Sequence, residues 1–420
     1  MWIKTKIEKI ISGLFFTVMF LRIIIALRQK FLDLQMCAKY SYAGDTDWLI
    51  NYHGGFVRRG LMGELVLFLT QELNIENPKW ILISLAGISA LLLIAIFVYL
   101  FKKNQLPWFV LPMSIFLGLE ITVRKDNLLL LLFAGLCYCM ARLLSKNSSW
   151  SIIPPPFCLL SLLLMLIGIN IHESFFFFSF PIFFFCIFSN KRLDLLQKFI
   201  SIVLPLVSFI LCIVFKGNEQ IVKGICDSWP QLTDIKRGGI DALTWNSLDT
   251  FKFHFTENFI KPSLGIMPIF VRPIIYILTF IVAVYGLFVF STPLSFMNDN
   301  RKNQLASILM IQFVCLLPMF TILSCDMGRV VIYWTLSSYL VFLLMPSDVL
   351  DRIIPTRIRT WVTSLTRSIE YLPINKYTIG ILILFLTITP IGFDIPKAFL
   401  KTSSIGSVIY FTQQFLERVI

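Results

Sequence analysis

Long apolar runs alternate with short polar segments along the whole chain. A transmembrane helix needs about 17–25 apolar residues. Runs of about this length lie at 10–27, 80–101, 106–122, 127–144, 152–170, 174–189, 198–215, 264–290, 305–323, 330–345 and 378–393. The pattern predicts an all-α fold, a polytopic transmembrane helical bundle of about 11 spans, with residues 1–420 forming a single integral membrane domain. We expect Pro181, Pro205, Pro273 and Pro318 to kink their spans.

The composition supports a membrane protein. Hydrophobic residues make up 57% of the chain and charged residues 15%, whereas a soluble protein carries about 25% charged residues. A net charge of +13 would also suit a nucleic-acid partner, but the chain has no compact basic domain. We therefore expect the lipid bilayer as a partner and no nucleic acid. The cysteines show no spacing typical of a zinc site or a disulfide framework.

The distribution of lysine and arginine predicts the orientation, because basic residues collect on cytoplasmic loops. With the N-terminus inside, the inner loops are short and mainly basic. They hold Lys4, Lys6, Lys9, Lys102, Lys103, Arg142, Lys146, Lys191, Arg192, Lys198, Arg301, Lys302, Arg352, Arg357, Arg359, Arg367 and Lys376. Arg28 and Lys30 run against this pattern. The unusual polar clusters then all fall on the outer side, which predicts that the protein works there.

The densest outer cluster is "DTDWLINYHGGFVRRGLMGE", residues 45–64, within a predicted first outer loop at 28–79. An apolar stripe predicts an interfacial helix at 56–72, formed by Val57, Leu61, Leu65, Phe68 and Leu69. Arg58 and Arg59 would lie at its N-terminus, where the helix dipole and arginine forks favour a phosphate. Asp45 and Asp47 lie just upstream. Alternatively, the arginines pair with lipid headgroups and the acids cap a loop.

Three shorter clusters occupy predicted tight outer turns. "RKD" supplies Arg124, Lys125 and Asp126, which either line a cavity or pair with one another in a solvated turn. "HES" supplies His172 and Glu173, a pair that can transfer protons but is more often structural. "CDMGR" supplies Asp326 and Arg329, either an ion pair or a phosphate contact.

A large outer loop is predicted at 216–262. It mixes Trp229 and Trp245 with aspartates and Arg237, a composition that suits sugar binding as well as any amphipathic lid. No nucleotide-binding or hydrolase motif accompanies these clusters along the chain.

The order of these features resembles the GT-C class of membrane glycosyltransferases. "GDTDW" and the helix at 56–72 match a catalytic acid in the first outer loop followed by an interfacial helix. "GFVRRGLMGE", "RKD", "HES" and "D-x-G-R" are also similar to multi-pass proteins of bacterial surface-polysaccharide clusters, including O-antigen polymerases. Many polymerases have two large outer loops, whereas this chain has one.

The resemblance implies an enzyme of the bacterial cytoplasmic (inner) membrane with its active face on the periplasmic side. Its donor and acceptor would be glycans on undecaprenyl pyrophosphate, with a chain-length regulator as a further partner. Asp45 or Asp47 would act as general base, with His172 and Glu173 as further catalytic candidates. The substrate-binding candidates are Arg58, Arg59, Arg124, Lys125, Asp126, Arg237, Asp326 and Arg329. No cofactor is required, although a divalent metal on Asp45 and Asp47 would be compatible.

Two other functions stay open at this point. A flippase or transporter of lipid-linked oligosaccharide would place charges within its spans, for which Arg22 and Arg272 are the main candidates. A transferase that adds a single sugar from an undecaprenyl-phosphate donor would share every feature of a polymerase except the length of its product.

Overall fold

The computed structural model describes residues 46–103, 125–144, 156–230, 238–244, 299–319, 323 and 327–370. These residues form twelve α-helices and two short 3₁₀ helices, so the all-α prediction is confirmed for this part of the chain. The α-helices are α3 (Gly60–Glu72), α4 (Lys79–Lys103), α6 (Asp126–Leu144), α7 (Pro156–Ile171), α8 (Ser174–Ser189), α9 (Leu195–Val214), α10 (Glu219–Asp227), α11 (Gly238–Asp241), α14 (Asp299–Pro318), α15 (Met327–Leu344), α16 (Ser347–Ile353) and α17 (Thr356–Glu370). The 3₁₀ helices are η1 (Asp47–Leu49) and η2 (Ala242–Thr244).

Seven predicted spans coincide with helices, namely α4, α6, α7, α8, α9, α14 and α15. Three of them, α4, α6 and α9, are long and apolar enough to cross a membrane, and α7, α8, α14 and α15 contain shorter apolar stretches. These helices suggest a membrane protein. The predicted spans 10–27, 106–122, 264–290 and 378–393 lie outside the described residues.

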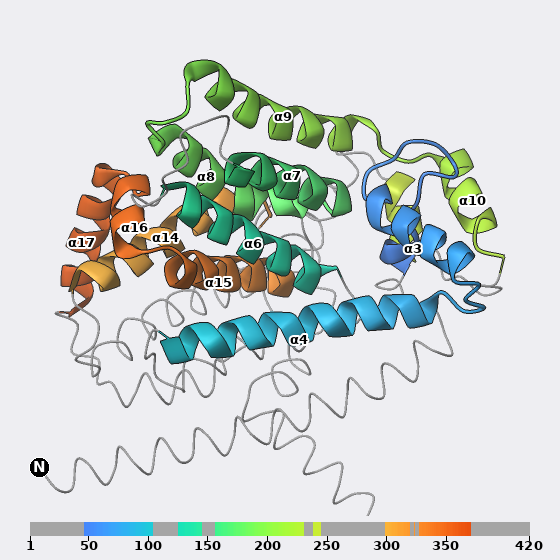
Figure 1. Cartoon of the computed structure of the whole chain (residues 1–420), viewed down its shortest axis with the longest axis horizontal. Coiled ribbons are helices and arrows are strands. Elements are labelled where there is room, and N and C mark those ends of the chain that lie inside the picture. Colours follow the sequence, from blue (N-terminus) through green and yellow to red (C-terminus); the bar gives the residue numbers. More distant parts are fainter. Residues whose placement is uncertain are drawn as a thin grey trace, which may run out of the picture.

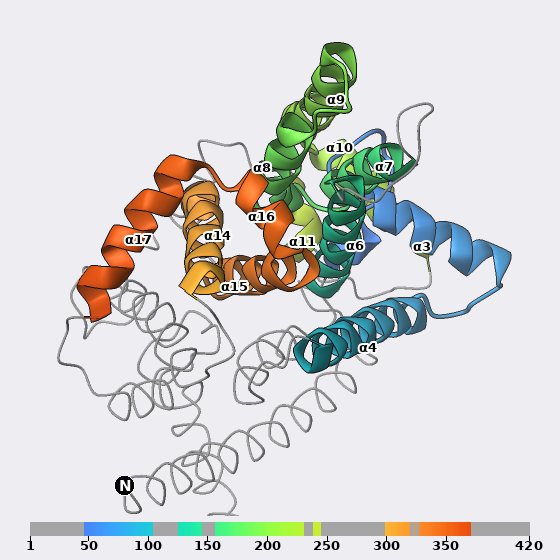
Figure 2. The same cartoon turned by 60° about the vertical axis from the view of Figure 1, so that its left-hand side comes forward.

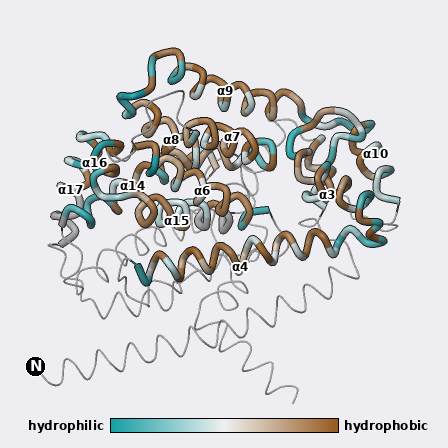
Figure 3. The backbone as a smooth tube through the Cα atoms, in the orientation of Figure 1, coloured by the Kyte–Doolittle hydropathy of each residue, from teal (hydrophilic) through white to brown (hydrophobic). Residues whose placement is uncertain are grey.

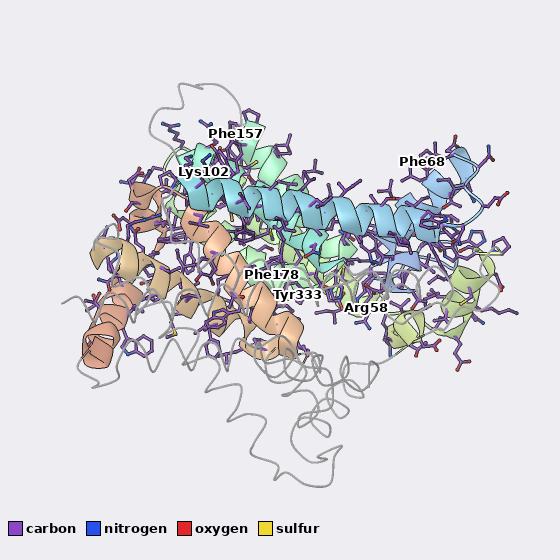
Figure 4. The ribbon with its side chains drawn as sticks, turned by 90° about the horizontal axis from the view of Figure 1, so that it is seen from below. Arg58, Phe68, Lys102, Phe157, Phe178 and Tyr333 are labelled. Atoms are coloured by element: carbon purple, nitrogen blue, oxygen red, sulfur yellow. The ribbon has the colours of Figure 1, made fainter. Side chains whose placement is uncertain are left out.

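Helices α4, α6, α7 and α9 run in roughly one direction in Figure 1, and hydrophilic residues gather at both ends of the bundle in Figure 3. At one end lie α3 and α10, and at the other lie α16 and α17. Figure 4 shows Lys102 toward the α17 end and Arg58 toward the α3 end, with Phe178 and Tyr333 between them. The described segments predicted to be inner and outer therefore separate to opposite ends of the bundle.

Helix α6 lies at the centre of the bundle, packed against α4, α7 and α15 (Figure 2). Phe133 of α6, Phe178 of α8 and Tyr333 of α15 are fully buried there, and the Phe178 and Tyr333 rings stack with centroids 4.9 Å apart. Helices α4 and α9 instead expose apolar side chains along most of their length and appear as largely hydrophobic tubes in Figure 3. Such faces suit contact with lipid tails.

Sequence features account for the helix boundaries. Asp194 and Gln197 form a reciprocal capping box at the start of α9, and Asn218 caps α10 through the Ile221 N–H. Pro181 lies inside α8 and removes one backbone donor. The buried Gln312 amide of α14 donates to the Phe178 carbonyl, which is one turn before Pro181. A neighbouring helix therefore supplies a donor where the proline disturbs the backbone ladder.

Helix α3 begins at Gly60, four residues later than predicted, because residues 52–59 form turns. Gly55 adopts a φ of +119°, and its N–H donates to the Tyr52 carbonyl. The predicted apolar stripe faces outward at Leu65 and Phe68. The opposite face, with Gly60, Gly63 and Thr70, packs inward against the η1 segment. Small residues on that face let the two backbones approach closely.

Replacement of Gly63 by alanine tests this packing. A Cβ at Gly63 would lie 2.0 Å from the Ile50 carbonyl oxygen, a backbone atom that cannot rotate away. We expect Gly63→Ala to lower the free energy of unfolding by about 1–3 kcal/mol, measured by denaturant titration of the detergent-solubilised protein.

The matched control is Gly87→Ala on the exposed face of α4, where a Cβ would meet nothing within 4 Å. This variant should be neutral or slightly more stable, because alanine is a better helix former than glycine. Equal effects of the two substitutions would contradict the close packing of α3 against η1.

Candidate functional site

Charged residues from three separate segments meet at the α3 end of the bundle. Asp47, Arg58 and Arg59 come from the first loop, Lys125 directly precedes α6, and Glu173 lies in the turn between α7 and α8. We call these five residues the charge cluster. Three of the sequence clusters predicted to be outer are therefore brought together by the fold.

Arg59 contacts both carboxylates of the charge cluster. Its Nε donates to Glu173 Oε2 at 2.8 Å, its Nη2 contacts Glu173 Oε1, and its Nη1 lies 3.3 Å from Asp47 Oδ1. The residue caps α3 with a left-handed backbone, φ +66°, which is uncommon for a residue other than glycine. Strained backbone of this kind persists where surrounding contacts hold it, and it is found disproportionately at functional sites.

Lys125 is fully buried at the start of α6. Its ammonium lies 3.7 Å from Asp47 Oδ2 and donates to the carbonyls of Arg59 at 3.3 Å and Ile171 at 3.4 Å. The turn before α6 is therefore packed against the first loop at Lys125, and the solvated turn considered from the sequence is wrong for this residue. Lys125 joins the starts of α3 and α6 to the end of α7.

Arg58 makes fewer side-chain hydrogen bonds than Arg59. Its Nη2 donates to the Ala242 carbonyl at 3.0 Å, and its Nη1 lies 3.8 Å from Glu173 Oε1. Its Nε is buried and has no hydrogen-bond partner among the described residues. The Arg58 side chain can therefore accept a further anionic contact without breaking a strong ion pair.

The electrostatics follow from burial and pairing. Burial alone would raise the pKa of Glu173, but neighbouring groups, with Arg59 as the largest contributor, outweigh it and hold that pKa well below its usual value. Burial lowers the pKa of Arg59, but Glu173 and Asp47 more than reverse this effect. Burial lowers the pKa values of Lys125 and Arg58, and carboxylates offset it only in part. Glu173 is therefore ionised and held by cations, which disfavours a role as proton acceptor in this state.

The charge cluster has three cations and two carboxylates, which leaves one positive charge in excess. Arg59, Lys125 and Glu173 directly precede α3, α6 and α8. The N-terminus of a helix carries a partial positive charge and free N–H groups, so three helix starts add to the local positive potential. The arrangement as a whole favours an anion.

His172 and Glu173 do not form a proton-transfer pair in this geometry. The Ser174 N–H donates to His172 Nδ1 at 3.1 Å, so Nδ1 carries a lone pair rather than a proton. The approach of Nδ1 to Glu173 Oε2, 3.6 Å, is therefore not a hydrogen bond. His172 serves here to close the turn between α7 and α8.

Asp126 accepts a hydrogen bond from the buried Tyr333 hydroxyl of α15. Tyr333 has no distinguishing signal in the sequence, because a tyrosine within an apolar run is an ordinary core residue. Its partner lies 207 residues away along the chain, so no local pattern could reveal it. Tyr333 links the start of α6 to α15 beside the charge cluster.

The described part of the predicted large outer loop is tied to the first outer loop. Hydrogen bonds run from Trp229 Nε1 to the Leu49 carbonyl, Asn51 Nδ2 to Ser228 Oγ, the Gly239 N–H to Thr46 Oγ1 and the Arg58 N–H to the Phe215 carbonyl. Trp229 is almost fully buried by this contact. It is therefore a packing residue rather than an exposed surface on which a sugar could stack.

The remaining candidates are not placed. Asp45, Arg124, Arg237, Asp326 and Trp245 lie outside the described residues. Arg329 lies in the first turn of α15, one helical turn before Tyr333, and its side chain is also outside the described part. Within the described residues, no group of three or more metal-ligating side chains is found.

Comparisons with known proteins add no assignment. No protein-family model matches the chain, no curated protein matches its sequence and no solved structure matches its fold.

Substitution of Glu173 tests the ion pair at the centre of the charge cluster. Glu173→Gln keeps the size of the side chain but leaves Arg59 and Arg58 short of one carboxylate. Removing one partner of a buried ion pair costs about 3–5 kcal/mol. We therefore expect the free energy of unfolding, measured by denaturant titration, to fall by an amount near the lower end of this range. Exposed Glu72→Gln at the end of α3 is the control and should change stability by less than about 0.5 kcal/mol.

A double variant, Arg59→Met with Glu173→Met, separates charge imbalance from lost packing. It should be more stable than Glu173→Gln, because it leaves no unpaired Arg59 in the protein interior. A double variant that is less stable than Glu173→Gln would contradict this account.

The pH dependence of stability gives an independent test. The folded pKa of Glu173 is depressed, so its contribution is complete above its unfolded pKa of about 4.5 and is lost as pH falls through the folded value. The stability difference between wild type and Glu173→Gln should therefore narrow as pH falls below about 4.5. A difference independent of pH would show that Glu173 is not held by cations.

Proposed function

We propose that this chain is a glycosyltransferase acting at the outer face of the bacterial cytoplasmic membrane on oligosaccharides linked to undecaprenyl pyrophosphate. We further propose that it polymerises O-antigen or capsule repeat units. The observation that carries the proposal is the charge cluster, which has excess positive charge and lies at the polar end of an apolar helix bundle. A lipid-linked sugar offers the matching chemistry, with an anionic group between a glycan and an apolar tail.

Arg58 is the proposed first contact of the donor pyrophosphate. Its buried Nε lacks a partner among the described residues, and its N–H donates to Phe215 immediately after α9. The half-exposed Phe56 and Phe215 rings pack edge to face beside it. Phosphate oxygens on Arg58 would thus lie next to the lipid-facing surface of α9, where the first isoprenoid units can pack.

The cations would act mainly on the transition state. Negative charge grows on the pyrophosphate as the glycosidic bond breaks, so fixed cations stabilise the transition state more than the ground state. Arg59 is already bound to Glu173 and Asp47 and holds the geometry. Lys125 adds charge from the start of α6.

Asp47 is the proposed general base among the described residues. In the present arrangement Arg59 and Lys125 both contact its carboxylate. A bound pyrophosphate would compete for these cations and free the carboxylate to contact the acceptor hydroxyl. Asp47 would then accept the proton of the acceptor hydroxyl only when the donor is present, which disfavours reaction without donor.

The placement of charges along the described helices favours a transferase over a transporter. A transporter is expected to carry ionisable groups within its spans. In α4, α6 and α9 the charged residues lie in the first or last turns, at Lys79, Lys102, Lys103, Asp126, Arg142 and Lys198. The mid-span candidates Arg22 and Arg272 lie outside the described residues.

Complementation of a deletion strain tests the proposal. The gene is deleted in a host that makes a complete surface polysaccharide, and the strain is complemented with wild type, Arg58→Gln or Asp47→Asn. The control is Lys223→Gln, which replaces an exposed lysine on α10. We expect single repeat units on the gel after deletion and a full ladder with wild type and Lys223→Gln. Arg58→Gln and Asp47→Asn should lower the polymerisation rate at least about a hundredfold and lose the ladder.

Expression of each variant in the membrane is checked by immunoblot, so that loss of function is not loss of protein. A complete ladder after deletion would overturn the polymerase proposal. A ladder of normal length with one sugar missing from each unit would favour the single-sugar transferase. A restored ladder with both Arg58→Gln and Asp47→Asn would refute the assignment of the charge cluster as the site.

A further inference from the structure

The end of the bundle opposite the charge cluster carries a second cationic surface with a different character. Seven exposed basic side chains from five segments occupy it, which we call the basic face: Lys102, Lys103, Arg142, Lys191, Arg192, Arg352 and Arg357. The exposed carboxylates among the described residues at this end are Asp194 and Asp348. The charge is thus strongly one-sided, and unlike the charge cluster it is open to the surroundings.

Three cation–aromatic pairs border the basic face. Lys103 Nζ lies 6.0 Å from the Tyr99 ring centroid, Arg142 Cζ lies 5.2 Å from Tyr138, and Lys198 Nζ lies 5.8 Å from Phe188. The three rings are exposed by 62%, 47% and 66%. Each ring lies toward the end of an apolar helix and is substantially exposed.

This combination is typical of the boundary between lipid tails and headgroups. Aromatic rings collect at that level, and long basic side chains extend past them toward the phosphates. The three pairs come from the ends of α4, α6 and α8, with Lys198 supplied by the start of α9. They therefore mark one common level of the membrane across separate helices.

Helix α17 has the features expected of a helix at the same boundary between lipid tails and headgroups. It runs across the direction of α4 and α6 at the edge of the bundle (Figure 1) and packs against α14. Val362 is buried and Ile358 is partly buried, whereas Arg357 and Trp361 are exposed, with 57% of Trp361 accessible. The ion pair between Arg359 and Asp351, 2.9 Å, fixes the helix to α16. An amphipathic helix with an exposed tryptophan and basic residues suits the plane of the interface.

We propose that the basic face is a binding surface for anionic phospholipid headgroups and that α17 lies in the membrane interface as part of it. The one-sided charge matches a phosphate-rich surface, and the aromatic rings set the depth at which it lies. Each lysine or arginine near an anionic membrane surface strengthens association by roughly fivefold. The inference is independent of the proposed enzymatic activity.

The test is lipid selection by the full-length chain. The protein is reconstituted into nanodiscs of phosphatidylcholine with a minor share of phosphatidylglycerol, and the lipids retained on release are counted by native mass spectrometry. We expect phosphatidylglycerol to be enriched over its share. The variant Lys191→Gln with Arg357→Gln should reduce this enrichment at least fivefold. The matched control, Lys216→Gln with Lys223→Gln, removes two exposed charges from the other end and should leave it unchanged.

A second measurement follows Trp361 directly. Lipids brominated near the headgroup quench tryptophan at the interface, so wild type should lose more fluorescence than Trp361→Phe. An equal reduction of phosphatidylglycerol enrichment in the two double variants would show that enrichment follows total charge, and it would overturn the proposal. Retention of both lipids in proportion to their abundance, or equal quenching of wild type and Trp361→Phe, would overturn it as well.

Discussion

The bidentate contact between Arg59 and Glu173 is the interaction on which the arrangement of the charge cluster depends. It joins the residue before α3 to the residue before α8 and crosses 114 positions of the chain. Charges in a largely apolar surrounding are costly unless each has a partner of opposite sign and good hydrogen-bond geometry. The pairing therefore fixes where α3 begins, how Asp47 is presented and which side of Lys125 is covered. It also holds Arg59 in a left-handed conformation that an unpaired arginine would be expected to leave.

The two ends of the bundle handle positive charge in opposite ways. At the α3 end, the cations lie inward and contact carboxylates and backbone carbonyls. At the α17 end, basic side chains point outward, and several lie on aromatic rings rather than on carboxylates. The first arrangement provides a preorganised positive potential for one small anion, and the second provides a broad surface. A bundle with lipid-facing helices between these ends would bring both into contact with phosphate groups of different kinds.

The loops at the α3 end behave as one packed unit. Gly54 and Gly224 let the first loop and α10 cross closely, since a Cβ at Gly224 would lie 2.7 Å from Gly54 Cα. The buried Trp229 then fixes the two loops together through the Leu49 carbonyl. This packing explains why a loop rich in tryptophan and aspartate cannot be assigned to sugar binding from composition alone.

The sequence by itself determined the elements and their order. Long apolar runs can satisfy their backbone hydrogen bonds in a membrane only as helices, so the runs at α4, α6, α7, α8, α9, α14 and α15 were predictable from length and hydropathy. The gathering of charged residues at the ends of these helices was predictable for a related reason, because charge is costly within an apolar span. The adjacency of Asp47, Arg58 and Arg59 in one loop also favoured a shared site.

Only the tertiary structure decided how those charges are used. The local sequence suggested that Lys125 pairs with Asp126, whereas Lys125 contacts Asp47. It also suggested that Glu173 transfers protons with His172, whereas Glu173 contacts Arg59. The face of α3 that packs inward was equally undetermined, because its glycines contact a backbone segment that precedes the helix. These outcomes depend on which helix ends come to lie together. A charged side chain pairs with the group nearby in space that binds it most strongly. Which groups are nearby depends on how helices that are distant in the sequence pack together.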